Sequence, residues 1–145
     1  MVDVKIKIIK GGRLPEFKTE GAVCADCYAR LGENEVMVIE PNCRALIPLG
    51  FAMQLPHGFE AVIRPRSGLS KDGIDNCIGT IDEDYRGEVN AIVINNSHED
   101  WRIHNSERIC QVAIREVSEI KFEVVEELSE TARGTGGFGS TGIKN

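Results

Sequence analysis

Residues 79–89 gather the side chains best suited to chemistry, three carboxylates followed directly by a tyrosine. They are Asp82, Glu83, Asp84 and Tyr85. Strand-like apolar residues flank them and Arg86-Gly87 supplies turn chemistry, so the segment predicts a β-hairpin. A hairpin tip can aim a carboxylate at a ligand while the tyrosine ring faces a planar group. A solvated acidic turn is the common alternative, and the segment alone leaves both interpretations open.

A pair of arginines marks a second place for chemistry, an anion-binding turn. Arg64-Pro65-Arg66-Ser67-Gly68 follows a predicted strand. Guanidinium groups suit phosphate oxygens, and a glycine lets backbone N–H groups come close to an anion. An exposed basic turn would explain one arginine, but it explains this combination less well.

The glycine-rich residues 133–142 combine an arginine with an aromatic side chain, Arg133 and Phe138. Their G-x-G-x-x-G pattern does not indicate a dinucleotide site, because no βαβ unit surrounds it. Glycine-rich tails are usually disordered. An arginine for phosphates and a phenylalanine for stacking instead predict an arm that orders over a ligand. We place this arm at residues 132–145 and a single domain at residues 1–131.

Asp26 lies inside residues 22–29, a run of mainly small and apolar side chains. Burying an unpaired carboxylate is costly, so Asp26 must be hydrogen-bonded or lie near a cation. A structural and a functional role fit it equally well. Cys24 and Cys27 form a Cys-x-x-Cys pair, but no second pair follows at zinc spacing, so we expect no metal or redox role for them.

Composition restricts the class of protein. With 145 residues, 41% hydrophobic and 28% charged, the chain is most simply one globular domain. The net charge of −6 argues against nucleic-acid binding, which needs a basic surface. The apolar runs are too short to span a bilayer and no signal peptide is seen, so we expect an intracellular protein without a membrane partner. Five cysteines at this low density indicate free thiols.

The elements that must position these groups are strands, because short apolar segments alternate with proline and glycine throughout. This pattern is typical of an all-β sandwich or barrel. Residues 2–8 alternate with a period of two and predict a half-buried strand. Further strands are predicted at residues 36–39, 45–49, 51–55, 59–63, 91–94, 101–103, 109–114 and 120–125. Only the surroundings of Leu69 and the segment before Arg133 leave room for a short helix.

Five stretches, taken together and in order, resemble the motifs of the trimeric dUTP diphosphatase (dUTPase) family over nearly the whole chain. They are Ala25-Asp26-Cys27-Tyr28-Ala29, Arg64-Pro65-Arg66-Ser67-Gly68-Leu69, residues 79–89, Glu107-Arg108-Ile109-Cys110-Gln111 and residues 133–142. The resemblance implies a jelly-roll β fold and a homotrimer with active sites where subunits meet. It also implies Mg²⁺-assisted hydrolysis of dUTP to dUMP and pyrophosphate, which limits uracil incorporation into DNA and supplies dUMP for dTMP synthesis. The expected location is the cytoplasm, including a host's if the protein is viral, or the nucleus of a eukaryote.

The resemblance also assigns roles to single residues. Asp82 is implied to be the general base that activates water, a task that suits a hydrogen-bonded carboxylate. Asp26 is implied to hold Mg²⁺ through water, with the substrate phosphates as the main ligands. Tyr85 is implied to stack on deoxyribose and to exclude UTP. The remaining implied substrate contacts are Arg66, Ser67, Gly68 and Gln111 for phosphates, Asn76, Gly79, Thr80 and Ile81 for uracil, and Arg133, Phe138, Gly139 and Ser140 of the closing arm.

Two departures from the family pattern and two alternatives remain. Lys71-Asp72-Gly73 replaces the usual lysine-histidine-glycine in a shortened loop, and Ser106 stands where glycine is common, which removes backbone freedom. The nearest alternative on the same fold is a dCTP deaminase, in which Glu88 would have to shuttle protons. The other is a nucleotide-responsive regulatory protein, since one fold can host several functions. Against it, a binder has no need of a water-activating base such as Asp82.

Overall fold

The computed structural model describes residues 2–137 of the chain. Its elements are β1 (Lys5–Ile8), β2 (Ala25–Tyr28), β3 (Val36–Ile39), β4 (Arg44–Pro48), β5 (Phe51–Gln54), β6 (Phe59–Arg64), α1 (Ser67–Lys71), β7 (Ile74–Asn76), β8 (Gly79–Ile81), β9 (Asn90–Asn95), β10 (Trp101–His104) and β11 (Arg108–Glu116). The expectation of an all-β protein with at most one or two short helical turns is confirmed, and α1 contains Leu69 as predicted. Within these residues no helix has the length and apolar character needed to cross a membrane.

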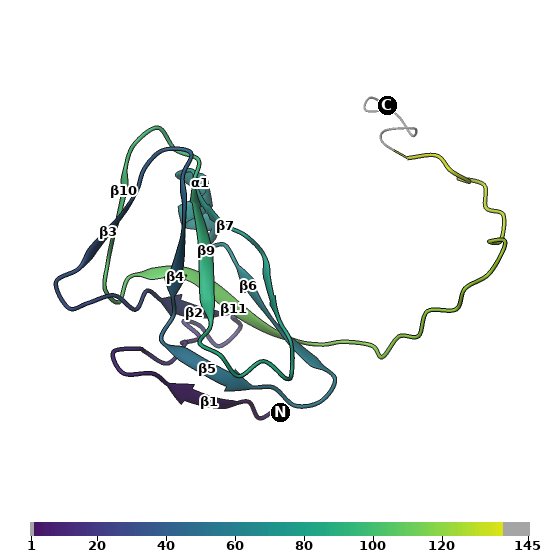
Figure 1. Cartoon of the computed structure of the whole chain (residues 1–145), viewed down its shortest axis with the longest axis horizontal. Coiled ribbons are helices and arrows are strands. Elements are labelled where there is room, and N and C mark those ends of the chain that lie inside the picture. The colour runs from purple at the N-terminus through teal and green to yellow at the C-terminus, as the bar shows by residue number, and fades with distance from the viewer. Residues whose placement is uncertain (1, 138–145) are drawn as a thin grey trace.

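The strands of the described chain form four antiparallel sheets. The largest has the order β2-β11-β6-β8, and a second has the order β4-β9-β7. β1 pairs with β5, and β3 pairs with β10. Figure 1 shows α1 at one end of the body and the β1–β5 pair at the opposite end. The large sheet matters most for function, because three of the stretches with predicted chemistry lie on it or directly beside it.

Alternating side chains of the inner strands build one core. β9 buries Ala91, Val93 and Asn95 and leaves the residues between them less buried, as the period of two requires. A buried amide must find partners, and the side chain of Asn95 donates to the backbone oxygens of Ile39 and Glu99, both at 2.8 Å. The amide group of Asn95 is therefore satisfied within a mainly apolar core.

The predicted hairpin at residues 79–89 is wrong, because its two flanking strands do not pair with each other. β8 pairs with β6 in the large sheet, whereas β9 pairs with β4 and β7 in the second sheet. The segment between them crosses from one sheet to the other. Its tight turn lies at Glu83-Asp84, where the N–H group of Tyr85 donates to the backbone oxygen of Asp82 at 3.1 Å. Asp82 thus stands where the chain leaves the large sheet.

The chain after β11 leaves the body as an extended tail (Figure 1). The strand predicted at residues 120–125 is wrong, and the described segment before Arg133, where the sequence left room for a short helix, is not helical. Ile120, Phe122 and Val124 are 72%, 88% and 98% exposed. A strand needs a paired edge, and residues 120–125 pair with no strand in the described part of the chain. β1 is likewise shorter and more exposed than the half-buried strand predicted at residues 2–8.

Candidate functional site

β8 and the segment after it line a cavity of about 220 Å³. The pairing of β8 with β6 fixes this wall, since Gly79 lies opposite Ile63. The lining residues are Ile63, Gly79, Thr80, Ile81, Asp82, Tyr85, Glu88, Val89 and Asn90. The structure therefore brings together five residues of the sequence-predicted site, from Gly79 to Tyr85, around one space.

Tyr85 and Asp82 reach this cavity from the turn that follows β8. The side chain of Asp82 is exposed, so solvent water reaches its carboxylate. The hydroxyl of Tyr85 donates to the backbone oxygen of Glu88 at 3.0 Å. The tyrosine ring lies so close to Gly87 that a Cβ atom added there would sit 2.3 Å from the hydroxyl oxygen. Glycine at this position is what leaves room for the ring.

The two glutamates of the segment serve as anchors. Glu83 accepts hydrogen bonds from the Nδ1 atom of His57 at 2.9 Å and the N–H group of Gly58 at 2.7 Å, and His57 lowers the pKa of its carboxyl. Glu88 is bound by both Nε and Nη2 of Arg30, at 2.6 and 2.7 Å. The Arg30 guanidinium lowers the pKa of Glu88 despite partial burial. Both glutamates therefore stay ionised and tie the segment to neighbouring loops.

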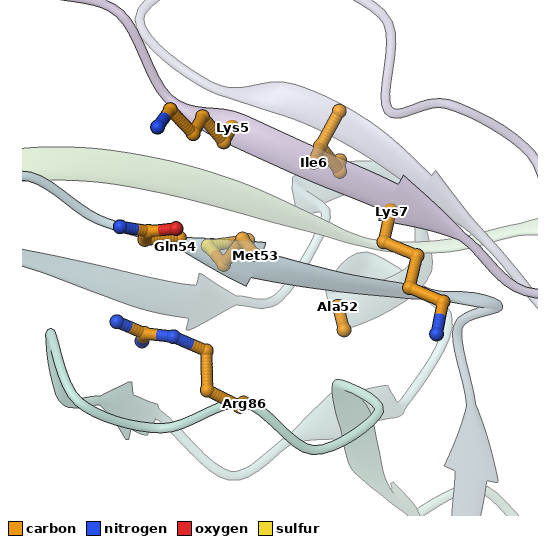
Figure 2. Close-up of a pocket in the computed structure, with 7 residues that line it drawn as sticks. All are labelled: Lys5, Ile6, Lys7, Ala52, Met53, Gln54 and Arg86. Atoms are coloured by element: carbon orange, nitrogen blue, oxygen red, sulfur yellow. The ribbon is translucent and has the colours of Figure 1, made fainter.

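Arg86 braces the same segment from within. Its Nη1 atom donates to the backbone oxygens of Glu83 and Tyr85, at 2.6 and 2.9 Å. Figure 2 shows the side chain extending alongside β5, below Gln54. It borders a second cavity of about 350 Å³, lined by Lys5, Ile6, Lys7, Ala52, Met53, Gln54 and Arg86. None of the predicted site residues lines this larger cavity, so the chemistry points to the smaller one.

Asp26 forms a second group with two arginines at the other edge of the large sheet. It is largely buried on β2, with Nε of Arg66 at 3.3 Å from one carboxylate oxygen and Nη1 of Arg108 at 3.0 Å from the other. The Nη1 atom of Arg66 also donates to the backbone oxygen of Arg108 at 2.8 Å. This arrangement satisfies the expectation that a carboxylate in a buried run must lie near a cation.

The strand register brings Gln111 into the same group. It lies opposite Asp26 on one side and opposite Arg64 on the other, and its Nε2 atom donates to the backbone oxygen of Pro65 at 2.8 Å. Ser67 and Gly68 follow at the start of α1, and both residues are exposed. The predicted phosphate-binding residues therefore surround the end of β6, where cationic groups and open backbone meet.

The remaining predicted residues lie apart from both groups or outside the described chain. Asn76 is buried on β7, donates to the backbone oxygen of Cys77 at 2.9 Å, and has no partner for its Oδ1 atom among the described residues. Arg133 lies exposed in the tail, and its Nε atom donates to the backbone oxygen of Gly136. The other predicted arm residues, Phe138, Gly139 and Ser140, lie outside the described residues.

The protein offers no complete metal shell in residues 2–137. No group of three histidine, cysteine or acidic side chains converges there, and all five cysteines are free, as predicted. Asp26 is a single carboxylate already facing two guanidinium groups. Mg²⁺ commonly keeps several waters and binds through one or two carboxylates plus substrate phosphates. The donor set thus fits an ion that arrives with a phosphate ligand.

Sequence reasoning missed three contributions to these groups. They are Arg108 beside Asp26, Arg30, and Glu88 as the ion-pair partner of Arg30. Arg108 lies in a quoted motif, but its contact with Asp26 crosses 82 positions of the chain. The Arg30–Glu88 contact crosses 58 positions. Each depends on how strands and loops meet in space, so no local pattern indicates it. The available signal is the carboxylate of Asp26 within an apolar segment. It predicts a nearby cation but does not identify the residue that supplies it.

Comparisons with known proteins find relatives of this chain. The dUTPase family model matches residues 12–142. A deoxyuridine 5'-triphosphate nucleotidohydrolase of Rhizobium rhizogenes is 46% identical over 137 residues, 92% of this chain and 88% of the relative. One of Treponema denticola is 45% identical over 145 residues, 98% of this chain and 99% of the relative.

A solved structure shares the fold. The dUTPase of Staphylococcus bacteriophage 80alpha with dUPNHPP superposes with a TM-score of 0.87 at 25% identity, covering 97% of this chain and 99% of that one. The expected dUTPase-like jelly-roll fold is thereby confirmed. With its fold and nearly its full length matched, the chain belongs to the dUTPase family.

Proposed function

We propose that the protein hydrolyses dUTP to dUMP and pyrophosphate, acting inside the cell to limit uracil incorporation into DNA and to supply dUMP for dTMP synthesis. The observation that carries the proposal is the cavity beside β8, where Asp82 and Tyr85 face one space with the backbone of Gly79. Membership of the dUTPase family supports the same reaction.

Asp82 is the proposed general base. It lines the cavity, is open to solvent and stands at the fixed end of β8, so a water molecule beside its carboxylate would have a defined position. As the water oxygen attacks the α-phosphorus, the carboxylate takes a proton and pyrophosphate departs from the opposite side. No covalent intermediate with the protein is needed.

Selectivity for the nucleoside follows from the walls of the cavity. The backbone of Gly79 and its neighbours presents fixed N–H and C=O groups to the uracil edge, and a wrong base would leave them unpaired. Tyr85 would lie against the deoxyribose and leave no room for a 2′-hydroxyl. Thr80 and Ile81 complete this wall. Asn76 precedes it, and its Oδ1 atom has no partner within residues 2–137.

The triphosphate is the proposed ligand of the group around Arg66. Arg66, Ser67, Gly68 and Gln111 surround the end of β6, and guanidinium and backbone N–H groups suit phosphate oxygens. Arg133 would reach the γ-phosphate as the arm closes, with Phe138 over the uracil. Asp26 would hold Mg²⁺ through water, and the bound ion would neutralise charge on the triphosphate.

We also propose a homotrimer with active sites shared between subunits. Two observations support it: within one chain the cavity beside β8 does not include Asp26 or Arg66, and the tail exposes a row of apolar side chains. Sedimentation equilibrium tests the assembly, with an expected mass of three 16.0 kDa chains. A monomer would leave the two groups of residues without a common site.

The surroundings of Glu88 do not favour the deaminase alternative, in which this residue would have to shuttle protons. Its carboxylate is bound by Arg30 and by the N–H group of Gly50, which keeps it ionised. The structure offers no comparable observation in favour of a purely regulatory role.

The deciding experiment is the substitution Asp82→Asn, measured by pyrophosphate release and by binding of a non-hydrolysable dUTP analogue. Because Asp82 is exposed, folding should be unaffected and binding largely retained, while kcat falls by about 10²–10⁴. Wild-type protein should release pyrophosphate from dUTP but not from UTP, dTTP or dCTP. If the variant keeps its turnover, Asp82 is not the base.

A further inference from the structure

We propose that the Arg30–Glu88 ion pair is a positioning unit that fixes the ring of Tyr85 and thereby sets the discrimination between deoxyribose and ribose nucleotides. The inference rests on the proposed function, in which Tyr85 contacts the sugar. Neither charged side chain has an assigned role in that reaction.

The pair is held more firmly than a simple surface contact. Two nitrogens of Arg30 donate to the two carboxylate oxygens of Glu88, at 2.6 and 2.7 Å. This two-point geometry fixes direction as well as distance. The N–H group of Gly50 adds a third hydrogen bond to the same carboxylate at 3.0 Å. Both side chains are mostly covered, with 29% and 22% of their surface exposed.

The backbone of Glu88 transmits this fixation to the cavity. Its carbonyl oxygen accepts the hydroxyl of Tyr85 at 3.0 Å and the side-chain amide of Asn90 at 2.8 Å. The next residue, Val89, is locked on both sides, donating to Phe51 and accepting from Leu49. The acceptor that orients Tyr85 therefore lies between an ion pair and a backbone anchor.

Gly87 supplies the other constraint on the ring. A Cβ atom at Gly87 would lie 2.3 to 3.0 Å from three atoms of the Tyr85 side chain. The ring thus rests on the backbone at Gly87 while its hydroxyl is tied to Glu88. A displacement of the acceptor carbonyl would tilt the ring over this contact.

Ring position matters because the two substrates differ by a single hydroxyl group. The ring of Tyr85 excludes a 2′-hydroxyl only if it cannot move away, and a loosely supported side chain loses such selectivity. Turnover of dUTP itself depends less on the ring, since Asp82 is placed by the turn after β8. Weakening the pair should therefore reduce selectivity more than rate.

A purely structural clamp between two loops is the competing explanation, and it predicts lower stability without lower selectivity. Three variants and one control separate the two. Arg30→Met keeps the aliphatic stem that packs against Gly50 but removes the guanidinium. Glu88→Gln keeps the length of the side chain and an acceptor, in case a larger change prevents folding. Gly87→Ala displaces the ring directly.

The matched control is Glu35→Gln. Glu35 also accepts a backbone N–H group, from Gly32 at 2.8 Å, but it lies in the loop before β3 and lines no part of the cavity. Its loss should lower stability slightly and leave selectivity unchanged. The readout is the ratio of Kd values for α,β-imido-UTP and α,β-imido-dUTP, with kcat for dUTP measured beside it.

We expect the Kd ratio to fall roughly tenfold in Arg30→Met and Glu88→Gln, with kcat of Arg30→Met, whose side chain lies outside the cavity, within about threefold of wild type. Gly87→Ala should lower the ratio at least as much. An unchanged ratio in both pair variants, with or without a lower Tm, overturns the inference. So does an unchanged ratio in Gly87→Ala, because the ring would then not be the discriminating wall.

Failure of the proposed function gives a different result. If the wild type binds the deoxy analogue selectively but releases no pyrophosphate from dUTP, hydrolysis is refuted, and the Kd ratios still decide the inference. If the wild type binds both analogues equally, the inference is overturned whatever the rate.

Discussion

Replacing Asp26 by asparagine should lower the stability of the protein by about 2 kcal/mol, a value that follows from its two contacts. Asparagine has the shape of aspartate but no charge, so two guanidinium groups would face each other without an anion. The hydrogen bond from Arg108 at 3.0 Å is charge-assisted, and such bonds contribute about 1.5–3 kcal/mol. The exposure of Arg108 places this bond at the lower end of that range.

The contact with Arg66 at 3.3 Å adds about 0.5–1 kcal/mol, the value of a partly screened ion pair. For a chain of this size, a loss of about 2 kcal/mol lowers Tm by roughly 4–8 °C. The assay is thermal unfolding without nucleotide at fixed protein concentration, because assembly makes Tm depend on concentration. Asp82→Asn is the matched control, since its carboxylate is exposed and its Tm should not change.

A double-mutant cycle with Arg108→Met locates the effect. If Asp26 and Arg108 stabilise the fold through each other, the double variant loses less than the sum of the single losses. A drop in Tm below about 1 °C for Asp26→Asn, or strict additivity in the cycle, would refute this account of the buried carboxylate.

Three further predictions follow from single contacts. Ser106 adopts a left-handed φ of 65°, so Ser106→Gly should raise stability by about 1 kcal/mol, measured by urea unfolding; no gain would mean that the strain is relieved elsewhere. Glu83 raises the pKa of His57, so this contribution to stability is complete below the unfolded pKa near 6.5 and is lost as pH rises through the folded pKa. NMR titration should show the His57 pKa falling in Glu83→Gln, and an unchanged value would exclude the contact. A Cβ atom at Gly12 would lie 2.0 Å from a backbone oxygen, so Gly12→Ala should lower stability by more than about 2 kcal/mol in the same unfolding assay. Gly21 has open space around it, so Gly21→Ala should lower stability by less than about 1 kcal/mol. Equal losses of stability would contradict the close approach at Gly12.

Local features of this protein were determined by the sequence alone. Short apolar segments between proline and glycine indicated an all-β chain, and the region of Leu69 indicated the one helix that the described chain contains. The types and spacing of Asp82 and Tyr85 likewise indicated a site, and both residues line the cavity. Such features depend on neighbours a few positions away, which is the range over which turn chemistry and a period of two operate.

Partners distant in the chain were decided only by the tertiary structure. The period of two shows which side of a strand is buried, but not which strand lies beside it, and for this reason the hairpin prediction at residues 79–89 failed. One cation beside Asp26 comes from Arg108, 82 positions away, next to a shift in strand register that no local pattern indicates. The strand prediction at residues 120–125 failed for the same reason, because a strand forms only where a neighbouring strand edge pairs with it.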